Sequence, residues 1–204
     1  MPNDRVQLAD WRRQVGEMYS KIRQLEPEQG WRAFRRERDF LLKTHPQSPL
    51  SEPHRERFEK LEYFPYDSQW RLTLPLEPPS SRSSIKIDLG EDGDFRITEM
   101  GRVRIGADAR LSLYWVEGYG GGLFLPFADR TNGGTTYGGG RYLLDGIKGS
   151  DLGMQGEQLI LDFNFAYNPS CVYDDRWVCP LPPERNRLPF EVKAGEKAFR
   201  LHAT

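Results

Sequence analysis

The sequence predicts an α+β fold that is mainly β: an antiparallel β-sandwich or partly open β-barrel, preceded by an N-terminal helical segment. Two observations predict this class. In the first part of the chain apolar residues recur at steps of three and four, the period of an amphipathic helix. Beyond about residue 66 they alternate with polar residues, the period of a strand with one buried face. We therefore expect a helical segment packed on the domain at residues 1–62 and a β-rich domain at residues 63–204.

The first helix is predicted from an apolar stripe that covers about six turns, and Asp4 could cap its start. Glu26-Pro27-Glu28 is expected to break this helix. A second helix, with Trp31, Phe34 and Leu41 on a shared side, should then pack against the first. The stripe of the first helix consists of Leu8, Trp11, Val15, Met18, Ile22 and Leu25.

A short third helix is predicted after Pro46 and Pro49, which end the second one. Ser51-Glu52-Pro53 suits its start, because serine caps a helix and proline fits the first turn. Phe58 and Leu61 supply its apolar side.

The second helix also carries a basic run that could contact an acidic partner, which would make the N-terminal helices a protein-interaction module. Glu37 and Asp39 interrupt this run, and that favours a solvated face. The run consists of Arg32, Arg35, Arg36 and Arg38.

The β-rich part is predicted from short runs of alternating residues that are separated by turn signals. Asn132-Gly133-Gly134 is a clear turn, because Asn-Gly between strands is typical of a hairpin. A last clear strand runs from Leu159 to Phe165, with Asp162 and Asn164 on one face, and a short strand is expected near Phe190-Glu191-Val192. The apolar residues of the earlier runs are Ile85, Ile87, Leu89, Phe95, Ile97, Val103, Ile105, Leu111, Leu113 and Trp115.

Residues 166–188 form a long predicted loop that is rich in proline and aromatic residues. Loops of this length in a compact domain tend to be either disordered or functional, and the aromatic residues argue against disorder. The loop holds Cys171 and Cys179, whose spacing suits neither a Cys-x-x-C redox pair nor a standard zinc motif. Three alternatives stay open for them: buried structural thiols, a sheltered disulfide, or half of a metal site.

Composition and charge exclude several classes of protein. The net charge is −1, and neither part of the chain carries a strong field, so nucleic acid and anionic membranes are not expected as partners. Residues 1–5 lack an apolar signal core, and no apolar run approaches the ~20 residues that a membrane-spanning helix requires. We therefore expect a soluble, cytoplasmic protein with reduced thiols. The sequence specifies neither a cofactor nor an oligomeric state.

Two familiar kinds of site do not fit the pattern. The glycine clusters at 118–122 and 138–140 lie between predicted strands and lack the helix start of a phosphate-binding loop, so we interpret them as turns or bulges. The histidines at positions 45, 54 and 202 show no ligand-like spacing. A catalytic triad or a His-rich metal site is therefore not expected.

The sharpest site hypothesis concerns Arg141. If residues 135–144 form a strand beside the strand at 159–165, Tyr137 and Arg141 share a face, and Arg141 approaches Asp162 or Asn164. The arginine could then anchor a carboxylate or phosphate under the loop, or it could pair with Asp162 as a structural ion pair. The predicted ligand-binding residues are Tyr137, Arg141, Asp162, Asn164, Tyr167, Asn168, Tyr173 and Asn186.

These residues leave three functions open. The leading one is a small-molecule-binding domain with a polar or anionic ligand near Arg141. The second is a hydrolase-type enzyme in which Asp162 or Glu184 acts as the acid or base. The third is the interaction module formed by the N-terminal helices. The sequence does not decide whether the protein is an enzyme.

Three stretches of the sequence resemble one known family. They are residues 122–142, with GLFLPFAD and TYGGGRY, residues 161–173, with LDFNFAYNPSCVY, and residues 179–197, with CPLPPERNRL and AGEK. On these motifs the chain resembles the family called domain of unknown function 1684 (DUF1684), from about Trp11 to Lys197.

The resemblance implies no activity, because the family is named for lacking one, and it supplies no catalytic residues. Phe165 departs from the family pattern, in which a short basic or small residue is usual. The residues that match the pattern are Thr136, Tyr137, Gly138, Gly140, Arg141, Asp162, Asn164, Tyr167, Asn168, Pro169, Cys171, Tyr173, Cys179, Pro180, Pro182, Pro183, Glu184 and Asn186.

Overall fold

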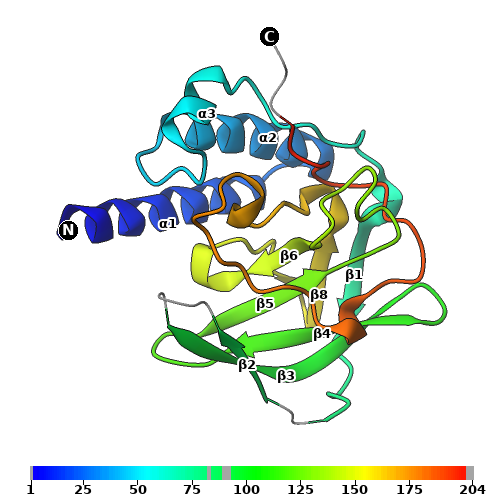
Figure 1. Ribbon diagram of the computed structural model, residues 1–204. Helices are drawn as coiled ribbons and strands as arrows, with labels where there is room; N and C mark the ends of the chain where they lie inside the picture. The colour runs from blue at the N-terminus through cyan, green and yellow to red at the C-terminus, as the bar shows by residue number, and fades with distance from the viewer. Residues whose placement is uncertain (1, 82–83, 89–92, 201–204) are drawn as a thin grey trace.

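The computed structural model describes residues 2–81, 84–88 and 93–200, and it confirms the α+β class: helices come first, followed by two antiparallel sheets (Figure 1). The sheets do not close into a barrel. The helices are α1 (Pro2–Ile22), α2 (Pro27–Thr44) and α3 (Glu52–Arg57). The strands are β1 (Arg71–Pro75), β2 (Ser84–Asp88), β3 (Asp94–Ile105), β4 (Ala109–Val116), β5 (Gly122–Phe127), β6 (Arg141–Asp145), β7 (Met154–Gln155) and β8 (Gln158–Asp162).

The helices occur where the apolar period predicts them, with differences at their ends. α1 already begins at Pro2, so Asp4 lies in its first turn and does not cap it. Pro27 is the first residue of α2, because proline is tolerated in the first turn of a helix. Ser51 precedes α3 as predicted, although its side chain makes no capping hydrogen bond. The expectation that Phe58 and Leu61 form the apolar side of this helix is wrong, because α3 already ends at Arg57. Of the helices in the described ranges, none combines the length and the apolar character needed to cross a membrane.

The larger sheet has the order β2-β3-β4-β5-β6, and the smaller one has the order β1-β8-β7. β3 is a single strand that joins two predicted runs, and its register against β4 shifts between Glu99 and Gly101. This bulge adds one residue and bends the strand. The apolar side chains on both sides of the shift, Ile97 and Val103, remain fully buried.

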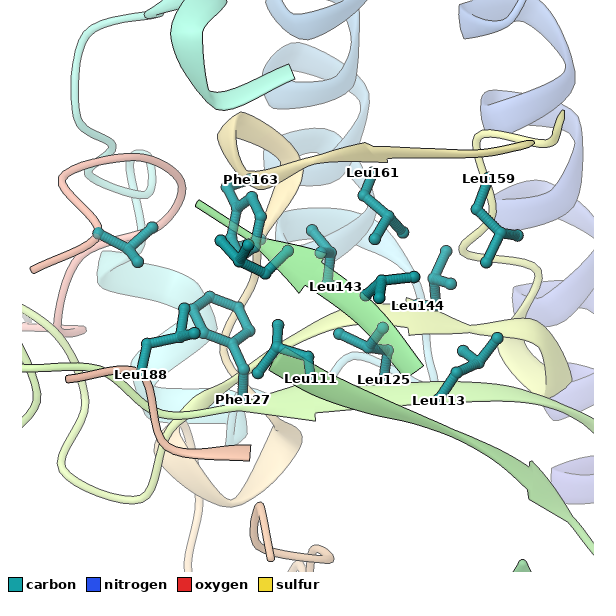
Figure 2. Packing of buried hydrophobic residues seen from close by; sticks show 14 of the residues in the cluster. Leu111, Leu113, Leu125, Phe127, Leu143, Leu144, Leu159, Leu161, Phe163 and Leu188 are labelled. Carbon is teal, nitrogen blue, oxygen red and sulfur yellow. The ribbon is translucent and has the colours of Figure 1, made fainter. Parts of the chain in front are cut away.

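The core lies between the two sheets. Leu111 and Leu113 of β4 and Leu125 of β5 belong to one cluster with Leu159 and Leu161 of β8, whose side chains point toward them from the other sheet (Figure 2). Burying each leucine contributes about 1.5–3 kcal/mol relative to exposure.

A second cluster joins the helices to the β-rich part. Phe34 of α2 is 1% exposed, and its ring lies 5.1 Å from that of Phe165 and 6.1 Å from that of Tyr63, between ring centroids. Tyr19 of α1 belongs to the same cluster, as does Leu152. The N-terminal helices are therefore packed on the domain through shared core residues.

Three predicted strands differ from the structure. Residues 135–140 form turns, and only Arg141–Asp145 is a strand, because Gly140 has a φ of 90° that breaks the extended backbone. The strand predicted to reach Phe165 stops at Asp162, whose carboxylate accepts a hydrogen bond from the backbone N–H of Asn164 at 3.0 Å and turns the chain. Residues 190–192 are not a strand, since the N–H of Val192 bonds to the Asp129 side chain. Leu89 and His202 lie outside the described residues.

Candidate functional site

Arg141 is fully buried, and its guanidinium connects several segments of the protein by hydrogen bonds. Its Nη2 atom donates to Asp129 at 2.9 Å and to the carbonyl of Val192 at 3.0 Å, and its Nη1 atom donates to the carbonyls of Ala194 and Glu196. The expected partnership with Asp162 is wrong, because β6 pairs with β5 and not with β8. Both terminal nitrogens of this guanidinium are thus engaged within the protein.

Asp162 and Asn164 likewise make internal contacts. Asp162 is fully buried and pairs with Arg71 at 3.3 Å, and burial raises its pKa. Asn164 accepts from the backbone N–H of Asp67 at 3.0 Å and donates to its carbonyl at 2.8 Å. These contacts fix the approach to β1 at the end of β8.

Asn186 and Glu184 lie on the far part of the loop. Asn186 is buried and joins β4 to β5, since its amide donates to the carbonyls of Ser112 and Pro126 at 2.9 and 2.7 Å. Glu184 is exposed, with its nearest cation on Arg187 at 2.8 Å. Neither arrangement creates a chemical site.

The remaining predicted residues of the loop, Tyr167, Asn168 and Tyr173, line one cavity of about 220 Å³. It lies between α1, α2 and the segment after β8, which Figure 1 shows running beside these helices. The apolar part of its lining includes Trp11, Val15, Met18, Phe34, Leu41 and Trp177.

Behind this cavity a buried carboxylate organises the polar residues. Glu196 is fully buried and accepts hydrogen bonds from Arg38 Nη2 at 3.1 Å, from the Asn168 backbone N–H at 3.0 Å and from the Asn168 amide at 2.9 Å. The Tyr173 hydroxyl also donates to it. This carboxylate therefore fixes a helix residue and two loop residues in one arrangement.

Arg38 is the cation of this arrangement. Its side chain is only 13% exposed, and its guanidinium lies 4.7 Å from the centroid of the Tyr167 ring. Burial acts to lower the pKa of Arg38, but Tyr173 and Glu196 beside it hold that pKa well above the ordinary value. Arg38 therefore remains charged.

Four residues of the cavity lining each carry a buried polar atom that has no hydrogen-bond partner among the described residues: the hydroxyls of Tyr19 and Tyr167, Nε of Arg38 and Oδ1 of Asn168. Ser150 lies near both hydroxyls, yet neither makes a hydrogen bond of standard geometry to it. Burial raises the pKa of both tyrosines, so their hydroxyls remain protonated donors. Buried polar groups are normally paired, and four unpaired ones around one cavity need an explanation.

The charges around the cavity are of one sign. Arg12, Arg38 and Lys148 line it, and its described lining contains no Asp or Glu. Two of these cations have partners just outside the lining, Glu196 for Arg38 and Asp145 for Lys148 at 3.2 Å.

Both cysteines lie at this cavity or beside it. Cys179 is part of the lining, and the backbone N–H of Cys171 donates to its Sγ atom at 3.3 Å. Tyr137 lies next to them, with its hydroxyl 3.8 Å from the sulfur of Cys171. In the described ranges no three His, Cys, Asp or Glu residues are grouped to hold a metal ion.

Sequence reasoning missed Tyr19 and Arg38. Arg38 was expected on a solvated face, and its burial corrects that interpretation. The signal was present, because Arg38 is four residues after Phe34 and three before Leu41, on the apolar side of the helix. A charged residue in that stripe indicates a buried polar contact.

The fold and the cavity define a class: a two-sheet α+β domain with a partly apolar cavity under its N-terminal helices. Residues 56–197 match the family described as protein of unknown function (DUF1684), and the chain belongs to this family. α1 and α2 lie before the matched residues.

A solved structure is similar to most of the chain. It is the solution NMR structure of the uncharacterized protein from gene locus rrnAC0354 of Haloarcula marismortui, which is 31% identical, with a TM-score of 0.57. The match covers 83% of this chain and 93% of that one. Among curated proteins, none matches the chain.

Proposed function

We propose that the protein binds a small molecule in the cavity between α1, α2 and the 166–188 loop. The observation that supports this is the cluster of unpaired polar atoms on Tyr19, Arg38, Tyr167 and Asn168. Leaving a buried donor or acceptor unpaired costs about 1–3 kcal/mol. A ligand whose head group bonds to several of them would recover part of that cost.

The size of the cavity limits the ligand. An engineered apolar cavity of about 150 Å³ binds benzene. By that measure the cavity of about 220 Å³ accommodates about nine non-hydrogen atoms. Trp11, Met18 and Leu41 would contact the apolar body of such a molecule.

The unpaired groups indicate the head group. The Tyr19 and Tyr167 hydroxyls and Nε of Arg38 can each donate a hydrogen bond, whereas Oδ1 of Asn168 can only accept one. A head group with several acceptors therefore fits, and an anion is favoured by the three cations of the lining, two of which also have carboxylate partners. We infer an aromatic or branched aliphatic carboxylate, held near Arg38 and not near Arg141. Neither Asp162 nor Glu184 belongs to this lining, so binding is proposed rather than acid–base catalysis.

The test combines ligand screening with one conservative variant. Small carboxylates such as benzoate, phenylacetate and 4-methylpentanoate, each with its uncharged amide, are added to the purified chain, and the melting temperature is measured. A carboxylate at a hundred times its dissociation constant should add about 2.7 kcal/mol to the free energy of unfolding. Tyr19→Phe should fold normally, because the lost hydroxyl has no partner, and should bind the same carboxylate about 2- to 12-fold more weakly.

Tyr114→Phe is the matched control. The Tyr114 hydroxyl is also buried and unpaired, but it belongs to a different cluster, with Phe124 and Tyr142. This variant should bind the carboxylate as the original chain does. The proposal fails if no carboxylate raises the melting temperature, or if Tyr19→Phe and Tyr114→Phe bind with the same affinity.

A further inference from the structure

The 166–188 loop contains a second chemical feature that the proposed ligand does not use. Cys171 and Cys179 are both free, both are partly buried, and the backbone N–H of Cys171 donates to the sulfur of Cys179 at 3.3 Å. The sulfur of Cys179 therefore lies against the backbone of Cys171, although the two residues are eight positions apart in the chain. Two free thiols held this close on one short segment form a pair that can be bridged by a disulfide.

The surroundings make the two sulfurs unequal. The Cys171 thiol beside it lowers the pKa of Cys179, against the effect of burial, and the Cys171 backbone N–H and Lys148 lower it further. Cys179 beside it, together with burial, raises the pKa of Cys171. Cys179, whose sulfur accepts the backbone N–H, is therefore the cysteine that loses its proton more readily. The thiolate is the reactive form of a cysteine.

We propose that Cys179 and Cys171 form an oxidation site for small hydroperoxides, in which Cys179 reacts first and Cys171 resolves the product as a disulfide. Cys179 belongs to the lining of the cavity and is only partly buried, so a small hydroperoxide can approach this residue. This inference rests on the two cysteines and is independent of the carboxylate ligand proposed above.

The reaction balances without a further partner. The Cys179 thiolate attacks one peroxide oxygen, so that an S–O bond forms, the O–O bond breaks, and the other oxygen leaves as an alkoxide or hydroxide that takes a proton from solvent. The sulfur of Cys171 then attacks the Cys179 sulfenic acid. An S–S bond forms, and the S–O oxygen leaves with the Cys171 proton as water. Two thiols lose two electrons in total, and the hydroperoxide gains them.

The disulfide would change the wall of the cavity. Tyr173 and Trp177 lie between the two cysteines in the chain and line the cavity. Tyr173 also holds Glu196, so a change in this segment reaches the residues that position Arg38.

The test exposes the reduced full chain to hydrogen peroxide and follows its intact mass and free thiols. The mass should fall by two hydrogens, both thiols should disappear, and dithiothreitol should restore them. The rate should rise with pH around a midpoint well below that of the same chain unfolded in urea, which should show the ordinary midpoint of about 8.5.

Single variants assign the two roles. Cys171→Ser should retain the peroxide reaction and accumulate a sulfenic acid that dimedone traps on Cys179. Cys179→Ser should react only at the rate of the unfolded chain. The proposal is overturned if the folded wild-type chain keeps both thiols, if it forms disulfides only between molecules, or if its reaction rate rises with pH around a midpoint near 8.5. Because these three outcomes are measured on the wild-type chain, they decide the proposal even if a variant does not fold.

Discussion

Two buried arginines show how packing decides the role of a charged side chain. Arg141 and Arg38 are each paired with a carboxylate, Asp129 and Glu196 respectively. Both terminal nitrogens of Arg141 are bonded inside the protein, whereas Arg38 lines the cavity. The same residue type is thus a structural tie in one place and a candidate ligand contact in the other.

The structural role of Arg141 leads to a stability prediction. Arg141→Met should lower the free energy of unfolding by about 3–5 kcal/mol, because it leaves the carboxylate of Asp129 buried without its cation. Urea denaturation would measure the change. Arg187→Met is the control: its ion pair with Glu184 is exposed, so the expected change is within about 1 kcal/mol. Equal stability of the two variants would contradict this role.

Single-residue reasoning from the sequence recovered part of the candidate site. Tyr167, Asn168 and Tyr173 were predicted because they lie in a long aromatic loop, and all three line the cavity. Tyr19 and Arg38 were not, since their place depends on how a helix packs against that loop. The position of Arg38 in the apolar stripe of its helix indicates that it is buried, but not which part of the loop it contacts.

At the scale of helices and strands, the period of the apolar residues predicted most elements correctly, whereas the predicted pairing of strands was wrong. α1, α2, β3 and β4 follow from periods that each segment carries by itself. The start of β6 depends on the turn at residues 138–140, and its position in the sheet depends on its partner β5. The alternation of apolar and polar residues within the segment indicates neither of them. The error at Arg141 came from that pairing.

The turn before Glu196 is an element on which the site depends. Gly195 has a φ of 79°, and an added Cβ would lie 2.7 Å from the carbonyl oxygens of Ala166 and Phe163. Gly195→Ala should therefore cost about 1–2 kcal/mol for the left-handed backbone and about 1–3 kcal/mol more for the steric clash. Chemical denaturation would measure the sum.

Gly106→Ala separates these two contributions. Gly106 has a φ of 69°, but an added Cβ there would meet nothing within 4 Å. Its substitution should cost only the backbone contribution, about 1–2 kcal/mol. If both alanine variants lose the same stability, close packing at Gly195 is not what fixes the turn.

At the scale of the whole molecule, the cavity exists only where the helices meet the β-rich part. Its walls come from α1, α2 and the segment after β8, so neither part forms it alone. The core cluster around Phe34 spans the same boundary. Ligand binding and the stability of the whole chain should therefore depend on the same packing.

Phe34→Ala tests this dependence. Phe34 is 1% exposed and contacts Phe165 across the boundary, so its truncation should cost about 3–5 kcal/mol. Because the cluster is shared, the helical signal in far-ultraviolet circular dichroism and the aromatic signal in the near ultraviolet should shift together to lower urea. Phe40→Ala on the same helix is the control: Phe40 is 63% exposed, and its change should stay within about 0.5 kcal/mol. If Phe34→Ala shifts the helical transition to lower urea while the aromatic transition stays in place, the helices unfold as a separate unit. A ligand bound in a cavity that both parts form could then not stabilise the whole chain.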